Sequence, residues 1–183
     1  CTVDLSAFYF DIRKDALYCD SKSAERRKNC IIVLNIILES LIKWFAPILS
    51  FTTEEIFTLI NKDNKSIHLE EFMEFPKSFQ NEQLNKKWKE LKKIRDICNV
   101  SIEAKRASKE IGSSLEANLI ISLNKNLIEL IKNIDMAELC ITSAAEIIET
   151  SSNETSAQTK KAEGEKCPVC WKINKDGCVR HPN

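Results

Sequence analysis

The residues best suited to chemistry lie at the end of the chain, where Cys167, Cys170, Cys178 and His181 form the pattern C-x2-C-x7-C-x2-H. Two ligands separated by two residues let a tight turn direct both at one ion, and two such pairs fill a tetrahedral site. Thiolates and imidazole are ligands that Zn²⁺ prefers, and a full set leaves no position for a reactive water. The pattern therefore predicts one structural zinc ion per chain.

Two other interpretations of these cysteines remain open: they are incidental, or Cys167 and Cys170 form a redox pair. A redox C-x-x-C usually opens a helix after a strand, whereas a polar segment precedes this one. The remaining cysteines are scattered along the chain. Scattered thiols with one cluster favour a reducing compartment over a secreted disulfide framework. We therefore expect a cytoplasmic protein.

Positive charge is concentrated in two regions, although the whole chain has 27 basic and 27 acidic side chains. Residues 86–109 are rich in lysine and arginine, and a smaller basic excess surrounds Trp171. Basic side chains neutralise RNA phosphates, and an exposed aromatic ring stacks on an unpaired base. The alternatives are a solvated lysine-rich helix and a tryptophan that only covers the metal site. The candidate RNA contacts are Lys86, Lys89, Lys93, Trp171, Lys172 and Arg180.

The first part of the chain is predicted to be helical. Apolar residues at spacings of three and four predict helices near 4–18 and 81–110, and shorter patterns predict helices near 24–46 and 53–62. The stretch 24–46 is apolar on nearly every side, which is typical of a helix inside a bundle.

Individual residues add detail to this prediction. Trp44 and Trp88 lie on apolar stripes and are predicted core residues. A T-x-x-E pattern at Thr52 and Glu55 predicts a capping box, and Gly112 is the expected residue after the last turn of the fourth helix.

The period changes after residue 112. Residues 115–123 and 138–143 are predicted as strands, residues 127–131 as a short helix, and residues 150–165 as a linker or an exposed hairpin. We therefore predict a mainly α fold with a helical bundle at 1–112, a small α/β junction element at 113–150 and a linker with a zinc module at 151–183.

Composition excludes several classes of protein. Three glycines leave no dinucleotide-binding or P-loop motif. The most apolar run, residues 30–46, is interrupted by polar residues and is too short to cross a membrane. No nucleophile with a neighbouring base has independent support, so we expect no catalytic residue in this chain. The start at Cys1, without an initiator methionine, leads us to expect a piece of a longer protein.

Several stretches resemble the C-terminal region of the isoleucyl-tRNA synthetases, a family of class I aminoacyl-tRNA synthetases. The first two of these stretches are shared in looser form with valyl and leucyl enzymes, and the last favours the isoleucyl family. The stretches are LSAFYFDIRKDALYCD at 5–20, APILSFTTEEIF at 46–57, SIHLEEFMEFP at 66–76, EAKRASKEIGSSLEANL at 103–119 and AEGEKCPVCW at 162–171.

The resemblance implies a helical anticodon-binding bundle, a small α/β junction and a terminal zinc module that approaches the tRNA. The family usually has four cysteines and a longer spacer at the zinc site, whereas this chain has a spacer of seven residues and His181 as its last ligand. The HIGH and KMSKS signatures, which the family uses for ATP, are absent from this sequence. ATP would therefore bind only in a catalytic domain outside this chain, and the chain alone is expected to be inactive.

The partners that the resemblance implies are an isoleucine tRNA and the remainder of the same synthetase chain, in a monomer. Two alternatives stay open. One is the same region of a valyl or leucyl ligase, and the other is a helical protein-interaction scaffold with a zinc knuckle and no RNA partner.

Overall fold

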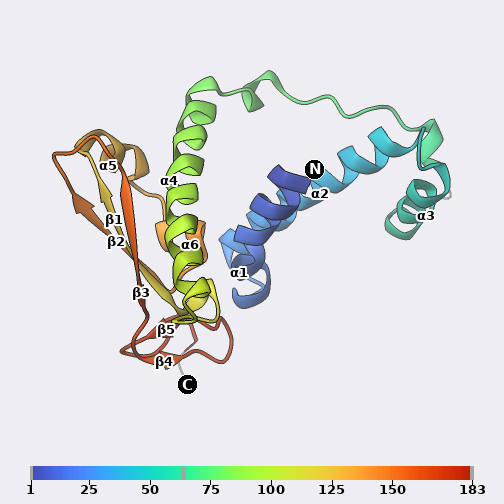
Figure 1. Ribbon diagram of the computed structural model, residues 1–183. Coiled ribbons are helices and arrows are strands. Elements are labelled where there is room, and N and C mark those ends of the chain that lie inside the picture. Colours follow the sequence, from blue (N-terminus) through green and yellow to red (C-terminus); the bar gives the residue numbers. More distant parts are fainter. Residues whose placement is uncertain (1, 63–64, 182–183) are drawn as a thin grey trace. The chain divides into compact units, whose positions relative to one another are not determined.

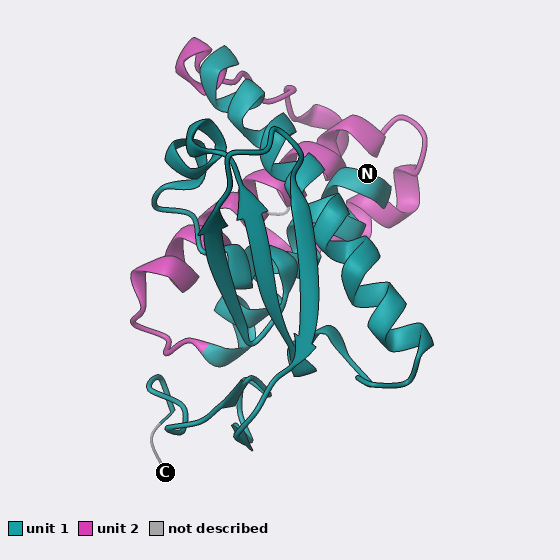
Figure 2. Ribbon diagram, turned by 60° about the vertical axis from the view of Figure 1, so that its left-hand side comes forward, with its two compact units in different colours: residues 1–19, 81–183 teal, residues 20–80 magenta. Residues whose placement is uncertain are grey.

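The computed structural model describes residues 2–62 and 65–181. The chain divides into two compact units, which Figure 2 shows in different colours. Unit 1 joins residues 1–19 to residues 81–183, and unit 2 consists of residues 20–80. Unit 1 therefore contains both regions that the sequence marks for chemistry, namely the basic helix and the C-terminal cysteines.

Unit 1 is built on a three-stranded sheet with β1 (Ala117–Leu123) at its centre. β2 (Ala144–Glu149) runs parallel to β1 on one side, and β3 (Ser156–Lys161) runs antiparallel to it on the other. Alternate residues of β1, beginning with Ala117, are fully buried. This period of two is expected for a strand that turns one face toward a core.

The long helix α4 (Glu82–Ala107) packs against this sheet (Figure 1). Thr159 of β3 lies opposite Leu119 of β1 and is hydrogen-bonded to Ser101 of α4 at 2.8 Å. Because opposite residues of an antiparallel pair point to the same face, α4 covers the face that carries Leu119. The buried stripe of α4, which completes this core, consists of Leu91, Ile94, Cys98 and Ile102.

Shorter helical segments complete unit 1, and one of them is the 3-10 turn η4 (Ser114–Glu116) just before β1. The chain is helical from its first described residue, with a π-helical segment η1 (Thr2–Phe10) followed by α1 (Asp11–Cys19). The other two helices are α5 (Lys125–Ile131) and α6 (Met136–Cys140), which lie between β1 and β2 in the sequence. α1 contributes Ile12 to the core of unit 1.

Unit 2 consists of α2 (Glu25–Phe45) and α3 (Ser50–Ile60), followed by two 3-10 turns, η2 (Ile67–Leu69) and η3 (Lys77–Phe79). α3 and η2 both contact α2. The small core of this unit is formed by Ile42, Ala46, Phe57 and Ile67.

The predicted fold class is confirmed: the chain is mostly helical, with a small mixed sheet and a C-terminal cluster of cysteine and histidine. The four predicted helices correspond to η1 with α1, α2, α3 and α4. The strand near 115–123 and the helix near 127–131 are β1 and α5. The domain boundaries after residues 112 and 150 stay a prediction.

The strand predicted at 138–143 is wrong, because α6 occupies the first half of this segment and no strand begins before Ala144. The Asp135 side chain accepts a hydrogen bond from the Glu138 backbone N–H at 3.0 Å and caps the helix. Ile141 then adopts a left-handed conformation with φ 56°, and β2 begins three residues later. A good N-cap therefore outweighs the strand propensity of a few apolar residues.

The linker or exposed hairpin predicted at 150–165 is also wrong, since β3 lies inside it and pairs with β1. Thr159 is buried in this strand, although its neighbours are exposed. Edge strands tolerate such polar composition because one side and one face contact solvent. The low apolar content of residues 150–165 is therefore compatible with a strand that pairs with β1.

Both predicted helix-end signals are wrong. α3 begins at Ser50, so Thr52 lies inside the helix and forms no capping box with Glu55. After α4 the left-handed residue is Lys109, with φ 60°. The Gly112 backbone N–H instead donates to the Glu116 carboxylate at 2.9 Å.

The two core tryptophans have different outcomes. Trp88 packs edge-on against Phe8, with ring centroids 6.0 Å apart, at the margin of the unit 1 core. Trp44 is 51% exposed, so the prediction that it lies in the core is wrong. Helix α2 also exposes Ile32 and Phe45, so the prediction that this helix is buried on nearly every side is wrong as well. Among residues 2–62 and 65–181, no helix has the length and apolar character needed to cross a membrane.

Candidate metal centre and RNA-binding surface

A short two-stranded ribbon holds the C-terminal cysteines. β4 (Glu165–Lys166) pairs antiparallel with β5 (Ile173–Asn174). In the turn between them, the Trp171 N–H donates to the Cys167 carbonyl at 3.0 Å, and the Cys167 N–H donates to the Lys172 carbonyl at 2.9 Å. This turn brings Cys167 and Cys170 to one side of the ribbon, as metal binding requires.

Gly164 allows the ribbon to close. Its φ is 123°, and a side-chain carbon at this position would collide with the backbone carbonyl of Asn174. Only glycine adopts such a conformation without strain and leaves room for a close backbone.

The four predicted ligands come together in space. The two cysteine sulfurs of the ribbon, the Cys178 sulfur and a ring nitrogen of His181 all lie within 4.8 Å of one another. Nδ1 of His181 is 3.5 Å from Cys167 Sγ and 3.3 Å from Cys178 Sγ, and Cys170 Sγ is 3.7 Å from Cys178 Sγ. These residues could hold a metal ion.

The spacing fits the zinc ion that the pattern predicts. Tetrahedral zinc, with Zn–S of about 2.3 Å and Zn–N of about 2.0 Å, holds two sulfurs about 3.8 Å apart and a sulfur and a nitrogen about 3.6 Å apart. Three of the separations between ligand atoms, 3.5 and 3.3 Å from sulfur to nitrogen and 3.7 Å between two sulfurs, are close to these values. Three thiols and an imidazole also form a donor set that suits zinc.

Hydrogen bonds prepare two of the ligands. The Cys170 backbone N–H, with a smaller contribution from that of Val169, lowers the pKa of the Cys167 thiol to about 6, which favours the metal-binding thiolate. His181 Nε2 lies 2.8 Å from the Cys19 carbonyl oxygen. Because a carbonyl only accepts, Nε2 carries the proton, and this hydrogen bond raises the pKa of His181. Nδ1 is then the nitrogen that faces the sulfurs.

A mainly apolar cavity of about 370 Å³ lies between α1 and the ribbon, within unit 1. Tyr18 lines it from α1, while Val169 and Trp171 line it from the metal-binding turn. Trp171 is 59% exposed, and the Lys166 ammonium lies 5.5 Å from the centre of its ring. The predicted aromatic residue is therefore accessible, with a cation beside it.

The predicted basic residues of α4 share one side of the helix. Lys86, Lys89 and Lys93 follow one another at spacings of three and four residues, and all three are exposed. Lys93 is paired with Glu90 at 2.7 Å. Within residues 2–62 and 65–181, Lys86 and Lys89 form no ion pair, so their charge is not neutralised there.

The predicted RNA contacts form two groups that the structure does not bring together. Lys86, Lys89 and Lys93 lie in the first half of α4, whereas the ribbon of β4 and β5, whose connecting turn contains Trp171 and Lys172, lies near the other end of this helix (Figure 1). The part of α4 from Lys89 to its end spans about 27 Å, at 1.5 Å per residue. Arg180 belongs to the second group, and its guanidinium is paired with Asp15 at 2.8 Å.

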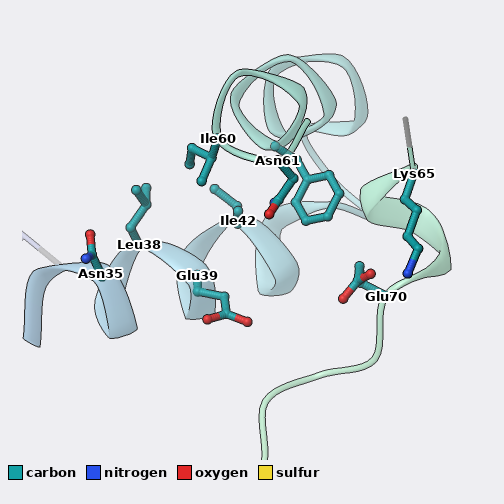
Figure 3. Close-up of a pocket in the computed structure, with 9 residues that line it drawn as sticks. Asn35, Leu38, Glu39, Ile42, Ile60, Asn61, Lys65 and Glu70 are labelled. Atoms are coloured by element: carbon teal, nitrogen blue, oxygen red, sulfur yellow. The ribbon is translucent and has the colours of Figure 1, made fainter. Parts of the chain in front are cut away.

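Unit 2 has a cavity of its own, of about 350 Å³, between α2, α3 and the segment that follows (Figure 3). Ile42 and Phe57 contribute apolar surface to it, and Glu39 and Glu70 lie at its margin. Both carboxylates are paired with Lys43, at 3.0 and 3.4 Å. Lys65 also lines this cavity, and no predicted site residue does.

Residues of α1 also take part in the site, and no sequence signal marks them. Tyr18 and Asp15 contact or face the metal-binding segment, which is more than 150 positions away. Asp15 occupies an ordinary place on an amphipathic helix, and the contribution of Cys19 comes from its backbone carbonyl. A backbone group has no sequence signal, so only the folded chain identifies it.

Comparison with known proteins shows similarity over the whole chain. The model of the family described as the anticodon-binding domain of tRNA ligase matches residues 1–121. The isoleucine–tRNA ligase of Pelagibacter ubique (strain HTCC1062) is 74% identical over 181 residues, which are 99% of this chain and 20% of that protein.

More distant relatives carry the same name. The isoleucine–tRNA ligase of Bartonella henselae is 41% identical over 94% of this chain and 19% of that protein. That of Mesorhizobium japonicum is 46% identical over 77% of this chain and 14% of that protein. The chain thus spans about a fifth or less of the length of these curated relatives.

The family match covers well over half of the chain, and it includes all of the helices that the sequence predicted before residue 112. This chain therefore belongs to the family of anticodon-binding domains of tRNA ligases.

Proposed function

We propose that this chain is the tRNA-binding part of an isoleucine–tRNA ligase, which attaches isoleucine to its tRNA with ATP in the cytoplasm. The observation that carries the proposal is the 74% identity to the Pelagibacter ubique ligase across nearly the whole chain. The catalytic and editing functions belong to the remainder of such a ligase. The chain alone is expected to perform no isoleucine activation, which isoleucine-dependent pyrophosphate exchange would test.

The same comparison weighs against the alternative ligases. The matching proteins of Pelagibacter ubique and Bartonella henselae are isoleucine–tRNA ligases, and their similarity extends to the C-terminal segment that favours the isoleucyl family. A valyl or leucyl ligase would share the helical region more than this segment. A protein-interaction scaffold without RNA is not favoured by membership in an anticodon-binding family.

The metal in this proposal is one structural zinc ion held by Cys167, Cys170, Cys178 and His181. When bound, it would cross-link the ribbon to the last turn of the chain and supply no open position for chemistry. The chain's own residues set up this cross-link. The Cys170 N–H stabilises the Cys167 thiolate, and the Cys19 carbonyl holds the proton of His181 on Nε2.

The RNA surface in this proposal has two parts. Lys86, Lys89 and Lys93 would neutralise RNA phosphates along one side of α4. Such contacts position the RNA on the protein and do not read its bases. An unstacked base of the anticodon loop would stack on Trp171 above the apolar cavity, with Lys172 nearby. Because the two parts lie at opposite ends of α4, the RNA would have to lie along this helix to touch both.

Arg180 is the sixth predicted RNA contact, and its position changes what it can do. Its guanidinium already forms a bidentate pair with Asp15. A phosphate would have to replace that carboxylate, so we expect Arg180 to contribute less to RNA binding than the lysines of α4.

The experiment that tests the proposal is binding of the purified chain to isoleucine tRNA and to the same tRNA with swapped anticodons, measured across salt concentrations. We expect tighter binding to the cognate anticodon and an affinity that falls as salt rises. Removal of residues 167–183 should reduce the discrimination between anticodons. Equal affinity for all anticodons with no salt dependence would instead support the protein-interaction scaffold.

A double substitution, Lys89→Gln with Lys93→Gln, tests the role of these lysines at RNA phosphates. It should weaken binding to every tRNA alike and reduce the slope of log affinity against log salt by about 0.7–0.9 for each phosphate that is no longer neutralised. The matched control is Lys125→Gln with Lys132→Gln, at the first residue of α5 and at the residue that follows it, because Lys132, like Lys93, is paired with a glutamate three residues earlier. An equal decrease in affinity for both variants would contradict a specific role for α4.

A further inference from the structure

The metal-binding segment is held to α1 by a charged pair between residues 165 positions apart. Arg180 Nη1 donates to Asp15 Oδ2 and Nη2 donates to Asp15 Oδ1, both at 2.8 Å. Two parallel hydrogen bonds between a guanidinium and a carboxylate fix orientation as well as distance. The two side chains are only 34% and 22% exposed, so solvent screens this pair less than a fully exposed one.

His181, the residue after Arg180, is held by the same helix. Its Nε2–H donates to the carbonyl of Cys19, the last residue of α1, at 2.8 Å. The last carbonyls of a helix accept hydrogen bonds from side chains outside the helix, as the Cys19 carbonyl does here. A second hydrogen bond on the far side of a ligating imidazole fixes the ring orientation and the tautomer of a metal ligand.

The first ligand pair has a further anchor. The Ile173 N–H of β5 donates to Ser143 Oγ at 2.6 Å, and Ser143 Oγ in turn donates to the Leu115 carbonyl. Ser143 immediately precedes β2 and is buried. The ribbon that carries Cys167 and Cys170 is therefore held by the α/β part of unit 1 as well as by the contact of Cys19 Sγ with the Val169 carbonyl at 3.7 Å. The histidine end of the ligand set is held by α1.

We propose that Asp15 is a positioning residue for the metal centre, which sets the place of His181 by binding its neighbour Arg180. The inference rests on the metal site proposed above. His181 is the last ligand in the chain, and ordering it costs conformational entropy that the ion would otherwise have to offset. Asp15 and the Cys19 carbonyl order this ligand before the ion binds, and such preorganisation strengthens binding.

Coupling between two sites is reciprocal, so the metal must also act on α1. If Asp15 strengthens metal binding by some factor, the bound ion strengthens the contact of Asp15 with Arg180 by the same factor. The last turn of α1, which lines the apolar cavity with Tyr18, is then more stable in the loaded protein. A metal site near the end of the chain thereby supports a helix near its beginning.

The test uses the whole chain, stripped of metal by a chelator and titrated with Co²⁺, whose visible absorption reports tetrahedral thiolate ligation. Zn²⁺ competition against the bound Co²⁺ then gives the zinc affinity. Asp15→Asn should weaken both affinities by about tenfold, the lower end of the effect of outer-shell partners. Asp15→Glu keeps the carboxylate and should recover most of the affinity.

The matched control is Asp11→Asn. Asp11 lies on the same helix, and its carboxylate pairs with Lys14 of that helix at 2.8 Å rather than with Arg180. Its replacement should leave the Co²⁺ affinity and spectrum unchanged. Arg180→Lys provides a second test at the other residue of the pair. It keeps the positive charge but removes the bidentate hydrogen bonds, and Arg180 lies outside the core.

Hydrogen exchange supplies a readout that is independent of affinity. Bound metal should slow exchange of the amides in residues 16–19 in the unchanged chain, and this effect should be reduced in Asp15→Asn. Equal Co²⁺ affinity in the unchanged chain, Asp15→Asn and Arg180→Lys would overturn the positioning role and leave the metal site standing. If the unchanged chain binds no Co²⁺ through thiolates, the metal site and the positioning role both fail.

Discussion

Unit 1 and unit 2 differ in how completely they bury their apolar side chains. In unit 1, Leu91 of α4 and Leu119 and Ile121 of β1 are almost fully inaccessible to solvent. In unit 2, Ile48 lies between α2 and α3 and Phe51 lies in α3, and both side chains are largely exposed. Both helices are nevertheless rich in apolar residues. The difference follows from what each helix packs against within its own unit, because a sheet gives α4 a broad surface, whereas α2 packs against α3 and the short turn η2.

The units also differ in the chemistry they present. The predicted metal ligands and the predicted RNA contacts all belong to unit 1. The cavity of unit 2 has carboxylates paired with a lysine at its margin. Sites that need fixed geometry benefit from rigid elements with packed support, and unit 1 supplies these. Substitutions in each unit test this difference, and the largest effect is expected at the predicted metal site.

Replacing Cys170 with serine should abolish metal binding without unfolding unit 1. We expect the metal content to fall from about one ion per chain to below about a tenth, given the strong affinity of structural sites. Elemental analysis measures the content, and urea unfolding followed by Trp88 fluorescence measures the core. Cys30→Ser, which changes a cysteine of unit 2, should keep the ion. Unfolding of the α4 and sheet core in Cys170→Ser would show that unit 1 depends on its metal.

Leu91→Ala should lower the free energy of unfolding of unit 1 by about 3 kcal/mol, because it leaves a cavity in a well-packed core. Ile42→Ala should destabilise unit 2 less, by about 2 kcal/mol, since the core around it is smaller. Urea unfolding distinguishes the two units when Trp88 reports on unit 1 and Trp44 on unit 2. A larger destabilisation by Ile42→Ala would reverse the comparison.

Asn81→Ala should destabilise the start of α4 by about 1 kcal/mol, because Asn81 Oδ1 accepts the Leu84 N–H at 2.9 Å and caps the helix. Thermal or urea unfolding of unit 1 measures this change. Asn85→Ala removes an exposed amide inside the same helix and should not destabilise it, since alanine favours helix. Equal effects of both variants would mean that the cap contributes nothing to unit 1.

Phe51→Ser should change the free energy of unfolding of unit 2 by less than about 0.5 kcal/mol, as expected for an exposed position. Phe51 is 93% exposed, whereas Phe57 on the same helix is buried. Phe57→Ser is therefore the matched comparison and should destabilise the unit several times more. A large effect at Phe51 would show that unit 2 buries this face in solution.

Much of the fold was predictable because its signals are local. The stripe of α4 and the alternation of β1 depend on residues a few positions apart, so a period in the sequence becomes a buried face. The strand expected at 138–143 failed because the Asp135 cap competes with strand propensity. β3 was missed because it is a polar edge strand, which has no apolar alternation to reveal it in the sequence. It is stabilised by pairing with β1, which lies more than thirty residues earlier.

The candidate site likewise combines features that have a local signal in the sequence with features that have none. The candidate metal ligands could be predicted from the sequence, because the spacing of Cys167, Cys170, Cys178 and His181 is a local requirement of two turns around one ion. That Asp15 and the Cys19 carbonyl contact the histidine end of this set is visible only in the folded chain. A turn is fixed by neighbours in the chain, whereas a contact across 165 positions exists only after the chain has folded.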